Sequence, residues 1–370
     1  MSIRNFPKYL VYIFFGAAAF LIEPSYAAEL GPVPESVDVK NFEKMATPFD
    51  IPSLKPRWRQ RIEVIRASGQ IPILDIESSF NPKKLDTRNF AEQMDKNGVA
   101  LIAMSAQVGK SEFKEEGKVW SDAAPRLMNI DPWRYIPAST AAIYPAWTEA
   151  PDEFLEKTIE KVTKDNYPLL GEFEFRHYPS PPEYKRGETY RDVTVPIDSE
   201  AGEKLFAFSE KSGLSFQIHY EVEDTLLPPL EKMLKKYPGA KVIWCHLAQV
   251  RYKGRASKYD AKYVEKLINE YPNLYFDLAF GDKDSIYPGS KEYHARVWDR
   301  NTGKIKPEWV DLIQAHPWRF LAAFDLGGDR MNDLPEKAKD MRYFLSNLPE
   351  PVREIVAYKA AWKLLFNEEI

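Results

Sequence analysis

Residues 214–248 read LSFQIHYEVEDTLLPPLEKMLKKYPGAKVIWCHLA and contain the repeating unit of this chain. Two β-rich runs, 214–221 and 241–248, flank a segment with helical spacing of its leucines, 225–236. Parallel neighbouring strands require such a helical crossover. Each run carries a histidine near its end, His219 and His246. The stretch therefore predicts a strand–helix–strand unit with an imidazole at the carboxyl end of each strand.

The same alternation continues along the chain. Helical patterns separate most of the β-rich runs, at 87–97, 152–164, 199–212, 225–236, 259–270 and 307–315. The β-rich runs themselves are 71–79, 99–107, 135–144, 169–177, 214–221, 241–248, 274–281 and 319–328. This repetition predicts an α/β fold of the (β/α)8 TIM-barrel type. A doubly wound open sheet is the alternative, but no glycine-rich phosphate loop follows the first run, which disfavours its dinucleotide-binding form.

The amino terminus has the features of a secretory signal peptide. Arg4 and Lys8 precede an uncharged, mostly apolar run over 10–22, and Ser25-Tyr26-Ala27 supplies small residues for cleavage. A membrane span needs about 20 apolar residues, so the run is too short for stable insertion, although an uncleaved anchor is the alternative. We therefore expect a periplasmic or secreted protein.

Three segments follow from these patterns. Residues 1–27 form the signal peptide, 28–69 an extended amino-terminal arm with a short surface helix over 56–68, and 70–370 one barrel domain. The net charge of −4 gives no basic surface for nucleic acid. We expect a small-molecule substrate as the partner, and self-association into a homo-oligomer stays open. The single cysteine, Cys245, excludes an intramolecular disulfide and is expected to be a buried, inert thiol.

Polar side chains gather near the ends of five predicted strands. Alternate residues of a strand share a face, so these groups are expected to converge if that face points into the barrel. Burying several unpaired charges costs several kcal/mol per ion, and a divalent metal bound by histidine and carboxylate would compensate this cost. In the fourth strand an internal ion pair of carboxylates with Arg176 is an alternative. The converging residues are Glu77, Glu172, Glu174, Arg176, His219, His246 and Asp325.

Several of these strand ends resemble one known family. The segments are Gln217-Ile-His219, Trp244-Cys-His246-Leu-Ala, Asn273-Leu-Tyr-Phe-Asp277, Ala323-Phe-Asp325 and the carboxyl-terminal helix Ala357–Phe366. In order and spacing they resemble the amidohydrolase-related superfamily, and above all its metal-dependent hydrolases and aminocarboxymuconate-semialdehyde-type decarboxylases. The resemblance covers residues 70–367.

The resemblance implies a role for each residue. It implies a divalent metal, zinc or manganese/magnesium, on four ligands: Glu77, Glu172, His219 and Asp325. It implies that Asp325 also takes a proton from the attacking water, and that His246 is a second metal ligand or polarises the substrate. In the hydrolase interpretation, His246 and Arg176 stabilise the developing oxyanion. His177 and Glu174 are the expected substrate-binding residues.

One motif departs from the family. The family's first strand carries Asp-x-His-x-His, where this chain has Asp75-Ile76-Glu77-Ser78-Ser79. Glu77 can still bind a cation through oxygen, but Ser79 is a poor ligand. Fewer imidazoles shift the preference from zinc towards harder ions such as manganese or magnesium.

These features together predict an exported metal-dependent hydrolase. Its substrate would be a small ester, amide or lactone, attacked by metal-activated water. A non-oxidative decarboxylase or hydratase on the same barrel is one alternative. A non-catalytic ligand-binding barrel that has lost its metal site is the other.

We predict cleavage between Ala27 and Ala28, because the charged start, the apolar run and the Ser-x-Ala sequence stand in the order that signal peptidases read. Amino-terminal sequencing of the exported protein should begin at Ala28. Recovery of an exported chain that still begins at Met1 would contradict the prediction.

Overall fold

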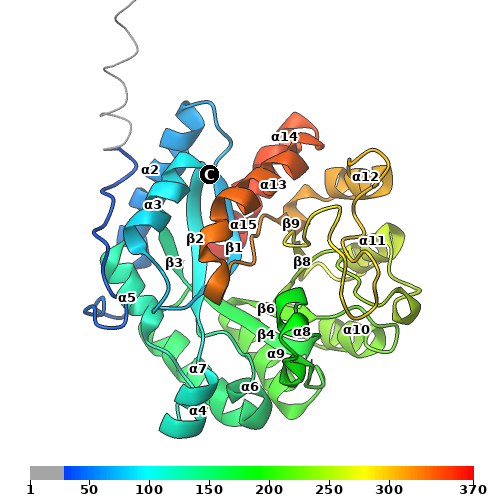
Figure 1. Cartoon of the computed structure of the whole chain (residues 1–370), viewed down its shortest axis with the longest axis horizontal. Coiled ribbons are helices and arrows are strands. Elements are labelled where there is room, and N and C mark those ends of the chain that lie inside the picture. The colour runs from blue at the N-terminus through cyan, green and yellow to red at the C-terminus, as the bar shows by residue number, and fades with distance from the viewer. Residues whose placement is uncertain (1–28) are drawn as a thin grey trace, which may run out of the picture.

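The β-rich runs of the sequence form the strands of a parallel barrel in the computed structural model, which describes residues 29–370 (Figure 1). The predicted signal peptide lies outside these residues, and its cleavage stays a prediction. The barrel strands are β1 (Ile73–Phe80), β2 (Val99–Ala106), β3 (Tyr135–Pro137), β4 (Leu169–His177), β6 (Ser215–Tyr220), β7 (Lys241–Trp244), β8 (Leu274–Asp277) and β9 (Phe320–Leu321). A short strand, β5 (Val193–Thr194), pairs antiparallel with the end of β4.

Hydrogen bonds close the strands into a ring. The order β1-β2-β3 and the order β4-β6-β7-β8-β9 are each continuous. Ser139 N donates to Leu169 O over 3.0 Å and joins the end of β3 to β4. Ile76 N donates to Ala322 O over 3.0 Å and joins β1 to the end of β9. The predicted eight-stranded barrel is confirmed, and the open sheet is wrong.

Helices surround the strands, and Figure 1 shows them as an outer layer. All six helices predicted between the strands are present, because each has one apolar face; in α10 that face is Leu227, Leu230, Met233 and Leu234. The longer helices are α2 (Ile51–Ala67), α3 (Thr87–Lys96), α4 (Lys110–Glu116), α5 (Ala123–Ile130), α7 (Pro151–Asp165), α9 (Glu200–Ser212), α10 (Leu227–Lys236), α11 (Ala261–Glu270), α12 (Pro307–Ala315), α13 (Leu334–Ser346) and α15 (Ala360–Phe366). Shorter elements are α6 (Ala146–Glu149), α8 (Pro181–Lys185), α14 (Glu350–Glu354), the 3-10 turns η1 (Thr189–Arg191), η2 (Lys253–Arg255), η3 (Pro317–Arg319) and η4 (Gly328–Asp333), and the π turn η5 (Ile355–Lys359). Within residues 29–370, no helix combines the length and apolar composition that spanning a membrane requires.

The helix that precedes the barrel differs from the expected short surface helix. α2 begins at Ile51, where the side chain of Asp50 accepts from Ser53 N, and it buries Trp58, Ile62 and Ile65 against the barrel. The prediction started the helix at Pro56, but the helix begins five residues earlier. Pro52 lies in its first turn, where proline is tolerated, and Pro56 lies inside the helix. α2 is therefore part of the core.

Two buried arginines fasten the amino-terminal arm beside the starts of β2 and β3. Arg134 donates to Pro32 O over 3.0 Å and to Asp95 over 2.6 Å. Arg61 donates to the same carboxylate of Asp95 over 2.8 Å and also binds Leu30 O. Arg134 also pairs with the buried Asp131 over 2.9 Å, and carbonyl oxygens of the arm supply further acceptors for the two guanidinium groups. The arm is thus hydrogen-bonded to the end of the barrel opposite the strand carboxyl ends.

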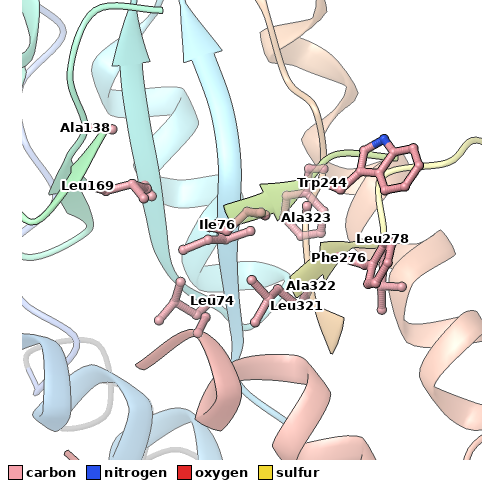
Figure 2. Packing of buried hydrophobic residues seen from close by; sticks show 14 of the residues in the cluster. Leu74, Ile76, Ala138, Leu169, Trp244, Phe276, Leu278, Leu321, Ala322 and Ala323 are labelled. Atoms are coloured by element: carbon pink, nitrogen blue, oxygen red, sulfur yellow. The ribbon is translucent and has the colours of Figure 1, made fainter. Parts of the chain in front are cut away.

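Apolar side chains fill the space around the strands. Figure 2 shows Leu74 and Ile76 of β1 near Leu321 and Ala323 of the β9 segment, with Phe276 of β8 beyond them. All five are buried. Apolar side chains therefore pack around the starts and centres of the strands, and the polar side chains of the site lie at the carboxyl ends.

Asp75 fixes the seam between β1 and β9. Its Oδ1 accepts from Glu77 N over 3.1 Å and from Phe324 N over 3.0 Å, and its Oδ2 accepts from Ser78 Oγ over 2.6 Å. The side chain is fully buried, and burial raises the pKa of Asp75 to about 8. Asp75 is therefore a structural group that holds the ends of the two strands together.

We predict that Asp75→Ala lowers the free energy of unfolding by about 3 kcal/mol, because it leaves two buried N–H groups without an acceptor. Asp75→Asn should cost less, since one side-chain oxygen remains for both groups. Urea denaturation measures both variants. Equal losses in the alanine and asparagine variants would show that these hydrogen bonds do not stabilise the seam.

Candidate active site

A cavity of about 420 Å³ opens at the carboxyl ends of the strands. This volume lies within the range of small-molecule sites. Its wall includes side chains from four strand ends, at Glu172, His219, His246 and Asp325. The convergence expected from strand alternation is therefore present for these four residues.

Three of the strand-end groups meet at one point. His219 Nδ1 lies 2.9 Å from Glu172 Oε1 and 3.1 Å from His246 Nε2. His246 Nε2 lies 3.5 Å from the same Glu172 oxygen. Donor atoms that share a tetrahedral ion at 2.0–2.1 Å stand about 3.3 Å apart. The spacing of this triad, Glu172, His219 and His246, therefore suits a common cation.

The outer nitrogen of each histidine has its own acceptor. His246 Nδ1 lies 2.8 Å from Ala279 O, a carbonyl that can only accept, so this nitrogen carries the proton. His219 Nε2 lies 3.2 Å from Glu221 Oε1, and Arg251 holds that carboxylate at 3.0 Å. In the neutral rings the two inner nitrogens are thus lone pairs facing each other and Glu172. Only a proton or a metal ion satisfies such an arrangement.

The same hydrogen bonds determine the ionisation of the triad. Burial opposes a charge on His219, but hydrogen bonds to Glu172 and Glu221 prevail and raise the pKa of His219 to about 10. Burial likewise opposes ionisation of Glu172, yet hydrogen bonds from His219 and His246 hold the pKa of Glu172 far below its usual range. A proton on His219 therefore satisfies the inner atoms of the triad, as a metal ion would.

A second carboxylate group lies beneath the cavity. Glu77 Oε2 and Asp277 Oδ2 are buried without a hydrogen-bond partner, and each residue has an oxygen within 4.8 Å of a His246 nitrogen. Burial, followed by the charges of Asp325 and Glu172, raises the pKa of Glu77 well above its usual value. Unpartnered carboxylate oxygens around His246 add to the demand for a cation, so the residues present fit a divalent metal.

Two of the strand-end residues have unusual backbones. His246 has φ 64° and Asp325 has φ 51°, in the left-handed region. Such a conformation costs of order 1–3 kcal/mol in a residue other than glycine and is common at functional sites. Both residues follow the ends of their strands, and both line the cavity.

The four expected metal ligands do not form one set. Glu172 and His219 meet at the triad, and Glu77 is only 4% exposed and lies below the cavity. Asp325 lies on the wall, but Arg330 binds both of its carboxylate oxygens, at 3.0 and 2.8 Å. His246, expected to be a second metal ligand or to polarise the substrate, completes the triad.

Arg176 is outside the cavity wall, which corrects its predicted catalytic role. It binds Asp192 over 2.6 Å and Glu223 over 2.8 Å, and its guanidinium lies 3.9 Å from the ring centre of Tyr178. A register shift between Glu174 and Arg176, where β4 pairs with β6, interrupts the alternation. Arg176 therefore leaves the face on which Glu172 and Glu174 lie.

The two predicted substrate-binding residues both line the cavity. Arg191 binds both oxygens of Glu174, one at 2.9 Å, so this carboxylate positions an arginine. His177 Nδ1 lies 2.8 Å from Arg191 O, and its ring centre lies 4.5 Å from that of His219. Burial and the nearby Arg191 hold the pKa of His177 well below its usual value. His177 is therefore neutral, with its proton on Nδ1 and a lone pair on Nε2.

The sequence analysis assigned no role to five residues that support the site. Glu221 shares a strand face with His219, and Asp277 ends a segment of the family resemblance, so both had a signal in the sequence. The three arginines that bind the site's carboxylates come from loops, where no periodicity marks them. These arginines are Arg191, Arg251 and Arg330.

Comparison with known proteins places the barrel among similar structures. No protein-family model and no curated protein matches the sequence. The chain is similar in structure to decarboxylases and amidohydrolases. A 2,6-dihydroxybenzoate decarboxylase complexed with 2,6-dihydroxybenzoate has a TM-score of 0.48 and 10% identity, over 80% of this chain and 99% of that one.

Two further solved structures have similar values. A dihydroxybenzoic acid decarboxylase from Polaromonas sp. JS666, with bound manganese and 2-nitroresorcinol, has a TM-score of 0.47 and 12% identity, over 81% of this chain and 98% of that one. A putative amidohydrolase from Staphylococcus aureus has a TM-score of 0.45 and 13% identity, over 80% and 99%. At such values the chemistry of this chain has to be inferred from its own residues.

We predict that Arg191→Met lowers the free energy of unfolding by about 3–5 kcal/mol, because it leaves the buried carboxylate of Glu174 unpaired. The double variant Arg191→Met with Glu174→Met should recover most of this loss. Urea denaturation of both variants is the measurement.

Lys204→Met is the matched control, since its partners Asp152 and Glu200 are exposed and the change should cost less than about 1 kcal/mol. A double variant no more stable than Arg191→Met would contradict the predicted coupling.

Proposed function

We propose that this protein is a metal-dependent hydrolase of a small ester, amide or lactone. The observation that carries the proposal is the triad, in which two histidine nitrogens and one carboxylate oxygen lie within 3.5 Å of one another. A divalent ion bound there would lower the pKa of water towards about 7 and polarise a substrate carbonyl. Glu172, His219 and His246 would hold it.

The groups behind the triad orient these ligands. Ala279 O fixes the tautomer of His246, and Glu221 does the same for His219. Such hydrogen bonds make an imidazole a better ligand and keep its ring in place. Arg251 in turn holds Glu221, so three layers of contacts determine where the inner nitrogens point.

A group on the wall has to accept the proton of the attacking water. His177 and Asp325 are the two candidates, and we assign the role to His177. Arg191 O binds its Nδ1 proton and leaves Nε2 as an acceptor, whereas Arg330 binds both oxygens of Asp325. This assignment moves proton transfer from Asp325, where the family resemblance implied it, to a neutral imidazole.

Cationic side chains on the wall favour a substrate that presents acceptor oxygens. Lys110, Arg186, Arg191, Arg251 and Arg330 line the cavity, beside the carboxylates of Glu172, Glu174, Glu183 and Asp325. Carbonyl and carboxylate oxygens match the N–H groups of guanidinium, and negative charge that develops on a carbonyl oxygen is stabilised by the same donors. An ester, amide or lactone meets this requirement.

The same wall also suits a substrate carboxylate, which supports decarboxylation as the second candidate. The products separate the two reactions, since decarboxylation releases carbon dioxide and hydrolysis consumes water to give an acid. The third candidate, a ligand-binding barrel without a metal, differs in having no stoichiometric ion.

We predict that the purified protein contains a divalent ion and that His219→Ala and His246→Ala each weaken its binding by about 100-fold or more, since each removes one of three donors. Elemental analysis and calorimetric titration with Zn²⁺ and Mn²⁺ measure this. His316→Ala is the matched control, because His316 follows α12 and is absent from the cavity wall.

Activity should follow the ion. A panel of small esters, amides and lactones, assayed with and without chelator, should reveal hydrolysis that His177→Gln reduces without loss of the ion. A folded protein with neither ion nor activity would favour the ligand-binding barrel, and carbon dioxide release from carboxylic acids would favour the decarboxylase.

A further inference from the structure

Arg330 and Asp325 form a bidentate pair at the β9 end of the cavity. Arg330 lies in η4, five residues after Asp325, and its two Nη groups bind the two carboxylate oxygens at 3.0 and 2.8 Å. Paired charge-assisted hydrogen bonds of this kind are among the strongest that side chains make. The carboxylate expected to bind a metal is therefore already bound to an internal cation.

The surroundings of this pair are rich in oxygen and poor in nitrogen ligands. The nearby Glu77 is buried, and its Oε2 has no hydrogen-bond partner. Ser79 stands on the wall where the family has a histidine, and its Oγ accepts from Gln107 Nε2 over 2.8 Å. The carboxylate of Asp325 thus needs a positive charge here, and the imidazole that would help to bind a metal ion is missing.

We propose that the guanidinium of Arg330 occupies, in place of a metal ion, the cation position beside Asp325. The chain then binds one divalent ion at Glu172, His219 and His246, and Asp325 is not among its ligands. The expected number of one ion rests on the proposed function, in which the triad binds a divalent ion. The role of Arg330 rests on its own contacts with Asp325.

Three properties of the site support this exchange of an ion for a side chain. A metal that bound Asp325 would have to displace two hydrogen bonds from a group that stays protonated at any pH the protein meets. Serine is a weak ligand for first-row metals. Arg330 also binds both oxygens of Asp325 in the bidentate geometry that favours an ionised pair.

The experiment counts Mn²⁺ ions by calorimetric titration and by elemental analysis after gel filtration. The wild type should bind one ion per chain. Arg330→Met removes the charge at similar length and should gain one ion, while Arg330→Lys keeps the charge and should gain none. Asp325→Asn added to Arg330→Met should abolish the gained ion, and Asp325→Asn alone should leave the count of the wild type unchanged.

Each outcome decides one proposal. A wild type that binds two ions, a folded Arg330→Met variant that gains none, or an ion lost with Asp325→Asn alone would overturn the role of Arg330. A wild type that binds none would overturn the proposed function, and the gain in Arg330→Met would still decide the role of Arg330. Circular dichroism and urea denaturation check folding, which Arg330→Met should preserve because the Arg330 side chain is 37% exposed.

Discussion

Hydrogen bonding across the seam between β1 and β9 is the constraint on which the site depends. Asp325 N donates to Glu77 O over 3.0 Å, and Ser79 N donates to Leu326 O over 2.7 Å. These bonds fix the register of the first strand against the last. Because the barrel is closed, this register also constrains the positions of the other strands along the barrel axis. The triad can form only because β4, β6 and β7 end at matching levels of a closed barrel.

Regular strands made part of this molecule predictable. In β6 the alternation of side chains is unbroken, so His219 could be placed on the inner face by counting, and the same counting placed Glu172 in β4. The eight-fold rhythm of β-rich and helical segments likewise gave the barrel, because each segment's apolar pattern reports the face it buries. The positions of side chains could therefore be predicted from periodicity wherever the strand backbone is regular.

Residues on irregular backbone could not be placed from the sequence. One extra residue in β4, opposite β6, moved Arg176 away from the cavity, and no propensity in the sequence announces such a shift. The cations that the carboxylates need come from loops: Arg191 ends the turn η1, and Arg330 lies in η4. Beside Asp325 the positive charge comes from Arg330, five residues later in the chain. No periodic pattern in the sequence marks this contact, so the sequence could not show whether a metal ion or an arginine lies there.

The seam also sets an order of events while the ribosome makes the chain. Asp75 and its partner Phe324 are 249 residues apart, and Ala322 N is bound in turn to Val356 O in η5 over 3.1 Å. During synthesis β1 can therefore pair with β9, its second neighbour, only after almost the whole polypeptide has been made. Until then the nascent sheet has open edges, which pair readily with other chains. A nascent chain of this design needs shielding from its neighbours until its last helices emerge.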